Sequence, residues 1–401
     1  MDIDFMRRMD RIFGVPICFV LTIWHKVSQA FRSKASLEPR KILVLQISEM
    51  GSAIHAFTSI NILKQRFPKA KIYYLIFDEM KKSVELLSQI PKEQILTIRS
   101  KSISGFAFDT IKNLWFLQRQ KIDVSIDYEL FSRFSAIMSF MSGAKERVGF
   151  HRFAMEGLYR GKFLTQEVIY NHTAPVGTNF IALTKSVGQL EAPLLKETII
   201  KPEVPKIMSL EKEKAAIWKK LQKSNPKVNR NSKLVIINPN ASQLLPLRRW
   251  PIHYYVELSR KILTDENVFV IITGIASEKP EAKELCKKLG TRCIDLTGET
   301  TLRELIDLYN ICHLMISNDS GPPNFASLTK METIVLFGPE TPICYAPIGG
   351  NIHVMYSHFC CSPCVSAYNH RKSYCTDNKC LQAIKPNEVY ELARQLINKG
   401  A

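Results

Sequence analysis

Short runs of β-branched and other apolar residues alternate with amphipathic stretches from Lys41 onward. In the first part of the chain the apolar runs have the length of strands, whereas stretches such as 54–66 and 108–119 repeat their apolar residues at helical spacing. This alternation is typical of βαβ units and predicts a parallel sheet. The expected strands are 42–48, 72–77, 95–98 and 124–128.

A second alternating series starts at Leu234 and runs nearly to the end of the chain. Within it, Thr301 and Glu304 have the spacing of a capping box, which predicts a helix beginning at Leu302. The expected strands are 234–239, 268–273, 293–296, 314–317 and 333–337, and the expected helices are 253–263, 279–289, 302–309 and 386–398.

Two such series predict an α/β protein with two Rossmann-like, doubly wound domains, 41–218 and 234–385. The polar stretch 219–233, which contains Pro226, is expected to link them, and 386–401 to add a C-terminal helix. Ligands of doubly wound sheets bind beyond the carboxyl ends of the strands, so the expected site is a cleft between the two domains.

The amino-terminal region 1–40 precedes the first series and is basic and apolar. Three arginines within its first eleven residues precede an apolar run at 12–24, which Pro16 interrupts. The run is shorter than the roughly 20 residues of a spanning helix. Three interpretations remain open: an interfacial helix on anionic lipid, an ordinary helix packed on the core, and a signal peptide. We expect a membrane-associating helix.

The formal net charge of the 401-residue chain is +18, which favours polyanionic partners. The basic residues are spread along the chain and do not form a tight block interleaved with aromatic residues. We therefore expect the surface of the inner membrane or an anionic glycolipid as partner, and no nucleic acid.

Ten cysteines are present, and five of them fall within 360–380. A secreted domain held by disulfides would be smaller and richer in cysteine, so a cytoplasmic location, peripheral on the inner membrane, is expected. Four cysteines of this loop have the spacing C-x2-C-x10-C-x4-C, which suits a structural zinc site, with plain thiols or disulfides as the alternative. They are Cys361, Cys364, Cys375 and Cys380.

Three turns of small, polar or basic residues follow strands of the second series. At 319–321 a strand ends and a helix opens, so free backbone N–H groups there could bind a diphosphate. After the strand 234–239, a polar turn leads to arginines suited to bidentate phosphate binding. The alternatives are an ordinary helix cap, a strand-to-helix turn and a solvated basic loop. The candidate donor-binding residues of these turns are Asn240, Ser242, Arg248, Arg249, Asp319, Ser320, Gly321, Gly338 and Thr341.

In the first series, residues 48–55 form a turn of mostly small residues after the first strand. Glu49 places a carboxylate in the expected crevice, where a general base could act. His55 falls within the following helix, where packing is favoured over a functional role.

The order of these motifs resembles glycosyltransferase family 9, the ADP-heptose:lipopolysaccharide heptosyltransferases. The likeness runs from about residue 41 to the C-terminus and is strongest over 234–345. The matching motifs are Lys-Ile-Leu-Val-Leu at 41–45, Arg-Phe-Pro at 66–68, Asn-Pro-Asn at 238–240, Arg-Trp-Pro at 249–251, Asp-Leu-Thr-Gly at 295–298, Asn-Asp-Ser-Gly at 318–321, Phe-Gly-Pro at 337–339 and Cys-Ser-Pro-Cys at 361–364.

This resemblance implies a GT-B fold, an ADP-heptose-like donor, a lipopolysaccharide or related acceptor, inversion at the anomeric carbon and no metal in catalysis. It also implies that Asp319, Ser320 and Gly321 hold the donor, and that Gly274 and Glu278 lie near its nucleoside. The alternatives are a GT-B enzyme that uses another sugar nucleotide, such as a UDP-sugar, and a catalytically weak membrane-associated protein that binds glycan or nucleotide.

Two positions depart from the family pattern. Ser52 stands where the family commonly has the aspartate taken to be the base, and the nearest carboxylate is Glu49, three residues earlier. Asn324 stands where the family has a histidine after its Asp-Ser-Gly motif. We therefore expect Glu49 to act as the base, beside Ser52, and Asn324 to contact the donor sugar.

Overall fold

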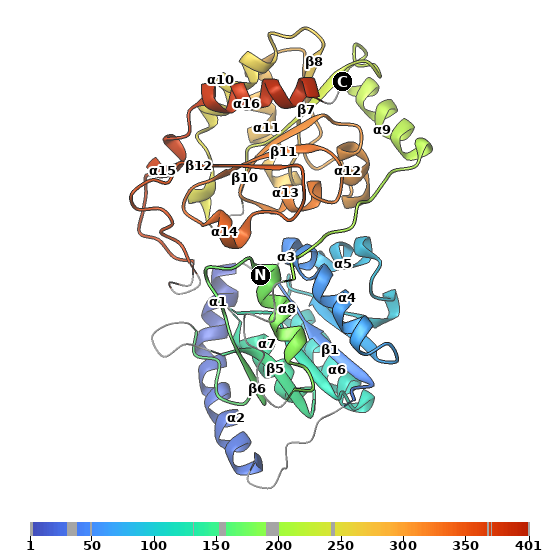
Figure 1. Cartoon of the computed structure of the whole chain (residues 1–401), viewed down its shortest axis with the longest axis vertical. Coiled ribbons are helices and arrows are strands. Elements are labelled where there is room, and N and C mark those ends of the chain that lie inside the picture. The colour runs from blue at the N-terminus through green and yellow to red at the C-terminus, as the bar shows by residue number, and fades with distance from the viewer. Residues whose placement is uncertain are drawn as a thin grey trace. The chain divides into compact units, whose positions relative to one another are not determined.

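The computed structural model describes residues 3–29, 38–48, 50–130, 132–151, 158–189, 200–241, 245–366, 369 and 371–399. The chain divides into two compact units (Figure 1). Unit 1 comprises Met1–Glu203 with Ala367–Arg371, and unit 2 comprises Val204–Ser366 with Lys372–Ala401.

Unit 1 is built on a six-stranded parallel sheet with the order β3-β2-β1-β4-β5-β6. The order reverses between β1 and β4, and ligands of doubly wound sheets bind at such a switch point. The four expected strands are confirmed, and two further strands, β5 and β6, were not expected. The strands are β1 (Lys41–Leu45), β2 (Lys71–Phe77), β3 (Ile95–Ile98), β4 (Val124–Asp127), β5 (Glu146–His151) and β6 (Gln166–Ile169).

Helices cover both faces of this sheet. On one face α6 and α7 pack over a core that includes Leu43, Leu75 and Leu117, and on the other α4 packs against α8. The helices of unit 1 are α1 (Ile3–Ile12), α2 (Gly14–Gln29), α3 (Met50–His55), α4 (Phe57–Arg66), α5 (Lys81–Leu87), α6 (Ile103–Gln120), α7 (Arg133–Met141) and α8 (Val176–Ser186).

The amino-terminal helices pack against unit 1 through α7. Pro16 lies in the first turn of α2, where its missing N–H costs no helical hydrogen bond. Cys18 is fully buried beside Ala136 and Phe163, so one side of α2 belongs to the core. Within the described residues, one helical stretch, Phe5–Ser28, is long and apolar enough to cross a membrane.

Unit 2 repeats the doubly wound plan, with the sheet order β12-β11-β10-β7-β8-β9 and a reversal between β7 and β10. Its core lies between this sheet and helices α10, α11 and α16. The five expected strands are confirmed, and an edge strand, β12, was not expected. The strands are β7 (Lys233–Asn238), β8 (Val268–Ile272), β9 (Cys293–Asp295), β10 (Leu314–Asn318), β11 (Glu332–Phe337) and β12 (Ile352–Tyr356).

Unit 2 begins earlier along the chain than expected. The expected linker at 219–233 overlaps α9, and the units divide between Glu203 and Val204. Ile217 and Leu221, four residues apart, are buried on one side of α9, so this polar segment is held by an apolar stripe. The helices are α9 (Glu211–Ser224), α10 (Ile252–Ile262), α11 (Lys279–Leu289), α12 (Leu302–Tyr309), α13 (Gly321–Ala326), α14 (Pro342–Tyr345), α15 (Lys379–Gln382) and α16 (Pro386–Lys399).

Candidate functional site

Asn318, the last residue of β10, organises the switch point of unit 2. Its Oδ1 accepts hydrogen bonds from the Trp250 N–H at 2.9 Å and the Tyr255 hydroxyl at 3.0 Å, and its Nδ2 donates to the Pro239 carbonyl at 2.7 Å. Burial raises the pKa of Tyr255 well above its ordinary value, so the hydroxyl keeps its proton. The loop after β7 is thereby fixed to the carboxyl end of β10.

Arg248 lies in that loop and joins two carboxylates from neighbouring strand ends. Its Nη1 is 3.3 Å from Asp319 Oδ2, after β10, and 3.4 Å from Glu340 Oε2, after β11. The side chains of Arg248, Asp319 and Glu340 are 13%, 9% and 1% exposed. Buried charges persist when they are paired, and Arg248 orients both acids. The sequence analysis identified Arg248 and Asp319 as candidates but not Glu340, although an acid three residues after a buried strand was a usable signal.

Arg249, in the same loop, provides a second guanidinium. Its Nη1 lies 3.9 Å from Glu281 Oε1. The Nε atoms of Arg248 and Arg249 are both buried, and neither donates to an acceptor among the described residues. Each arginine therefore retains a donor suited to an anionic group.

The start of α13 offers fewer donors than the sequence analysis assumes. The helix has six residues, and Pro322 and Pro323 in its first turn have no N–H. The Ser320 hydroxyl donates to the Asn318 carbonyl at 3.1 Å, so it is already engaged. A diphosphate held here would depend more on the arginines than on the helix start.

Asn324 lies one turn further along α13 and is 8% exposed. Its Nδ2 donates to the Ser320 carbonyl at 3.2 Å. Its buried Oδ1 accepts no hydrogen bond from the part of the chain that the structure describes. An amide oxygen in this state suits a hydroxyl donor such as a sugar.

Several other donor-binding candidates stabilise the turns in which they lie. Glu278 Oε2 accepts from the Ile275 N–H at 2.8 Å and lies so close to Gly274 that a Cβ there would meet it at 2.4 Å. A Cβ on Gly338 would meet Leu381 at 2.5 Å, and Thr341 caps α14. Asn240 is buried after β7, and Ser242 lies outside the described residues.

At the switch point of unit 1, the Glu129 carboxylate holds the turn after β1. Glu129 Oε1 accepts from the N–H groups of Ile47 at 2.7 Å and Ser48 at 2.9 Å, and from the Ser48 hydroxyl at 3.1 Å. Glu129 is 8% exposed and follows β4, the neighbour of β1. No local sequence pattern marks Glu129, because its pairing with Ser48 depends on strand order.

Of the two catalytic candidates in that turn, the structure describes only one. Glu49 lies outside the described residues, whereas Ser52 lies in α3 and is half-buried. His55, at the end of α3, is 5% exposed, which agrees with a packing role.

A buried charge cluster lies at the carboxyl end of β4, near the turn after β1. The Asp127 carboxylate, at the end of β4, is contacted by the Arg160 guanidinium and by the Ser135 hydroxyl at 3.0 Å. Burial raises the pKa of the Asp127 carboxyl, although Arg160 opposes the shift. The cluster fixes the start of α7 against β4.

The cysteine-rich loop docks on the turn after β11, because the N–H groups of Cys364 and Val365 both donate to the Pro339 carbonyl at 3.0 Å. Within the described ranges, no cluster of three or more His, Cys, Asp or Glu side chains has the geometry to hold a metal ion. The expected zinc site therefore gains no support from the geometry and stays a prediction. A disulfide, not expected from the sequence, joins Cys286 to Cys293 at the end of α11 and the start of β9.

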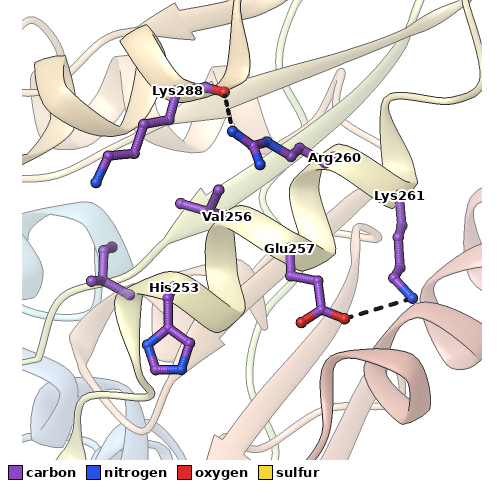
Figure 2. Close-up of a pocket in the computed structure, with 7 residues that line it drawn as sticks. His253, Val256, Glu257, Arg260, Lys261 and Lys288 are labelled. Atoms are coloured by element: carbon purple, nitrogen blue, oxygen red, sulfur yellow. Dashed lines mark hydrogen bonds and ion pairs between the residues drawn. The ribbon is translucent and has the colours of Figure 1, made fainter.

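A cavity of about 500 Å³ lies elsewhere in unit 2, along α10 (Figure 2). Arg260 donates to the Lys288 carbonyl at 3.3 Å, and Lys261 lies 3.6 Å from Glu257. None of the donor-binding candidates lines this cavity, so we do not place the functional site there. Its lining residues are Ile252, His253, Val256, Glu257, Arg260, Lys261 and Lys288.

Two doubly wound parallel sheets, each with polar residues gathered at its switch point, define a GT-B protein. The sequence model of glycosyltransferase family 9 (heptosyltransferase) matches residues 116–375. The chain belongs to this family, as the motif resemblance predicted.

Three proteins illustrate how similar the chain is to known heptosyltransferases. The lipooligosaccharide heptosyltransferase 2 of Campylobacter jejuni is 27% identical over 185 residues, which are 45% of this chain and 56% of that protein. The lipopolysaccharide heptosyltransferase 2 of Escherichia coli is 30% identical over 114 residues, 27% of this chain and 32% of that protein. The solved structure of E. coli ADP-heptose lps heptosyltransferase II has a TM-score of 0.69 at 20% identity, and covers 90% of this chain and 99% of that one. The chain thus spans about half the length of the Campylobacter relative.

Proposed function

We propose that the protein transfers a heptose-like sugar, with inversion, from an ADP-heptose-like donor to lipopolysaccharide or a related glycolipid. The observation that carries the proposal is Arg248, held between Asp319 and Glu340 at the strand ends of unit 2 in a chain of this family. The relatives that the chain matches are named as heptosyltransferases, which supports the choice of sugar.

In this proposal the donor diphosphate accepts hydrogen bonds from Arg248 and Arg249. The cluster of Arg248, Asp319 and Glu340 has two carboxylates for one guanidinium, so it cannot by itself attract an anion. The acids instead orient Arg248. Arg249, with its Nη1 3.9 Å from Glu281, supplies a second guanidinium, so the two arginines would act through directed N–H bonds rather than through a net positive charge. Fixed cations that stabilise a departing diphosphate contribute strongly to such a reaction, because charge develops on that group in the transition state.

The sugar would be oriented by Asp319 and Asn324. Asp319 is an acceptor beside the arginines, and Asn324 Oδ1 is an acceptor within α13. Hydroxyl groups on the sugar would donate to both, placing the anomeric carbon beyond the strand ends of unit 2.

The acceptor half of the reaction belongs to unit 1. An acceptor hydroxyl attacks the anomeric carbon, the bond from that carbon to the diphosphate breaks with its electron pair, and a carboxylate takes the hydroxyl proton. We propose Glu49 as this base, next to Ser52. Glu129 supports the assignment indirectly, because it holds Ser48, the residue before Glu49.

We propose a transfer step without a metal, in which the arginine N–H groups stabilise the leaving group. The cysteines Cys361, Cys364, Cys375 and Cys380 remain proposed ligands of a structural zinc ion. Metal analysis of the purified protein, with about one zinc per chain expected, tests this part separately.

The proposed location is the cytoplasmic face of the inner membrane, where the enzyme would be peripheral. The net charge of +18 supports an anionic lipid surface and a phosphorylated glycolipid as partners. This location would keep the acceptor within reach while the donor arrives from solution.

The test is donor-dependent transfer to a deacylated, water-soluble lipopolysaccharide core. Purified protein is supplied with ADP-heptose, with a UDP-sugar and with a GDP-sugar, and product is followed by mass spectrometry. Transfer from ADP-heptose alone is expected. Transfer from the UDP-sugar alone would replace the proposed donor, and nucleotide binding without any transfer would replace the enzyme by a binding protein.

A further inference from the structure

We propose that one helical face of unit 1 docks on an anionic bilayer, and we call it the lipid face: the outward surfaces of α1, α2 and α6. The inference rests on the proposed function, because a glycolipid acceptor presents its sugars at such a surface. Apolar side chains of α2 and α6 would enter the bilayer and bring one edge of the unit 1 sheet towards it.

The outward side of α2 is apolar over most of its length. Six of its side chains are between 41% and 68% exposed, and at 100° per residue they share one side of the helix. A water-soluble surface rarely keeps this many large apolar groups together without a partner. The six are Ile17, Phe19, Val20, Ile23, Trp24 and Val27.

The opposite side of α2 forms hydrogen bonds with the rest of unit 1. The His25 Nδ1 atom is 3.1 Å from Arg147 Nη2, and the Thr22 hydroxyl accepts from the Lys162 N–H at 2.9 Å. Asp10, in α1, pairs with Arg133 at 3.0 Å. A helix that crossed the bilayer would have to break these polar contacts or draw unit 1 into the hydrocarbon, so α2 lies along the membrane surface.

A second apolar stripe stands on α6, far from α2 in sequence. Phe108, Ile111 and Trp115 are each more than half exposed and lie on one side of the helix. Both α6 and α2 pack against α7, so they belong to the same helical layer of the sheet. The stripe therefore adds apolar groups to the layer that already carries α2.

The charges of this layer decide the kind of surface it meets. The acidic side chains described on α1, α2, α6 and α7 are Asp10 and Asp109, and each is ion-paired with an arginine, Arg133 and Arg99 respectively. The exposed charges are cationic, which complements anionic headgroups. They are Arg7, Arg8, Arg11, Lys26, Lys112 and Arg119.

Aromatic side chains fit the same partner. Arg119 lies over the Trp115 ring at 3.5 Å, and Trp24 is among the most exposed apolar groups of α2. Tryptophan favours the boundary between hydrocarbon and headgroups, where arginine can reach phosphate.

The layer also sets which edge of unit 1 faces the acceptor. Asp10 Oδ1 accepts from the N–H groups of Arg133 and Phe134, at the start of α7 and therefore at the carboxyl end of β4. His25 contacts Arg147 near the amino end of β5. The helix pair thus runs along the strands, and the arginines of α1 stand at the edge where the acceptor would react.

The experiment is co-sedimentation with vesicles of phosphatidylglycerol and phosphatidylethanolamine, compared with phosphatidylcholine alone. Wild-type protein is expected to bind the anionic vesicles, and more weakly as salt is raised. The double variants V20S/W24S on α2 and I111S/W115S on α6 should each weaken binding about tenfold, because two large apolar groups lose their burial. The matched control is M208S/L210S, which removes exposed apolar groups from unit 2 and should bind like wild type.

Transfer to the deacylated core is measured on the same proteins. Both lipid-face variants should keep wild-type turnover there, because the substrate needs no membrane. Turnover on that core without binding of wild-type protein to anionic vesicles would overturn the docking proposal alone. Vesicle binding without turnover by any variant would overturn the proposed function alone. A wild-type dimer that both variants convert to monomer, or variants that bind vesicles as wild type does, would also overturn the docking proposal.

Discussion

Glu129 and Ser48 meet across the switch point of unit 1, where the Glu129 carboxylate accepts both the N–H and the hydroxyl of Ser48, at 2.9 and 3.1 Å. A third bond, from the Ile47 N–H at 2.7 Å, ends on the same oxygen. These three bonds fix the backbone of residues 47 and 48 to Glu129, just beyond the carboxyl end of β4. Glu129 is therefore a positioning residue for the turn that carries Glu49 and Ser52.

The first prediction follows from this arrangement. E129Q keeps the shape of the side chain but loses the charge that holds the two N–H groups, so the turn shifts. We expect kcat to fall about tenfold to a hundredfold, since small displacements near a reacting group cost rate on this scale. The KM for the donor, whose proposed site is in unit 2, should change less than twofold in steady-state assays.

The pH profile separates positioning from proton transfer. With Glu129 as a positioning residue, the acidic limb of the kcat profile persists in E129Q at lower amplitude. Loss of that limb would make Glu129 the base instead. S48A is the matched variant, because it removes only the hydroxyl contact and should cost less than E129Q.

A second prediction concerns Arg248. R248K retains the positive charge but has one nitrogen instead of three. The contacts to Asp319 and Glu340 are both made by Nη1, so the substitution removes the Nε and the second Nη, which are the donors left for the diphosphate. We expect kcat/KM to fall about a hundredfold and the melting temperature to drop, because a buried carboxylate loses its partner, a change worth about 3–5 kcal/mol at the limit of full removal.

The control for this variant is R260K, which alters an exposed arginine on α10 outside the proposed site. It should leave both turnover and melting temperature near wild type. Wild-type turnover in R248K would refute the role of Arg248 at the leaving group.

The fold follows from the sequence wherever a strand is apolar and buried. Most of strands β1 to β4 and β7 to β11 are of this kind, and the half-buried edge strands β3 and β9 were expected from their apolar residues. β5 is buried but was not expected, because its sequence Glu-Arg-Val-Gly-Phe-His is largely polar. β6 and β12 are edge strands with half-buried or alternating residues, and no run of apolar residues marks them. The linker was misplaced because α9 is polar on most of its surface, and only Ile217 and Leu221 tie it to the core.

The site followed from the sequence only in part, for a reason of topology. Arg248 and Asp319 stand in motifs that can be recognised along the chain. Glu129 and Glu340 matter because β4 neighbours β1 and β11 neighbours β10, and strand order is not written in any local pattern. The limited donor set of α13 could have been foreseen, since Pro322 and Pro323 lack N–H groups.

A third prediction tests the role of Asn324 towards the sugar. N324A removes the buried Oδ1, which accepts no hydrogen bond from the described residues. If a sugar hydroxyl donates to it, the affinity for ADP-heptose falls about fivefold to tenfold, the usual effect of one lost hydrogen bond. The affinity for ADP, which has no such sugar, should stay within twofold by isothermal titration. Equal losses for both ligands would show that Asn324 acts only through the fold of α13.

A fourth prediction concerns the thiols of the cysteine-rich loop. Burial, with smaller contributions from the neighbouring Cys364, Cys361 and Cys375, raises the pKa of the Cys380 thiol to about 11. A raised thiol pKa keeps the neutral form at pH 8, where roughly a thousandth of this group would be thiolate. Iodoacetamide at pH 8 should therefore label the exposed Cys361 and Cys375 within minutes, and leave Cys380 unlabelled in mass spectrometry of peptides.

Zinc would change this labelling in a definite way. Four bound thiolates would all be protected, and a chelator would expose Cys361 and Cys375 to iodoacetamide while releasing one metal ion per chain. Rapid labelling of these two thiols before any chelator is added, in protein that contains no zinc, would remove the metal from the proposal. C375S is the informative variant, because it deletes one ligand at an exposed position and should abolish zinc binding without disturbing the buried Cys380.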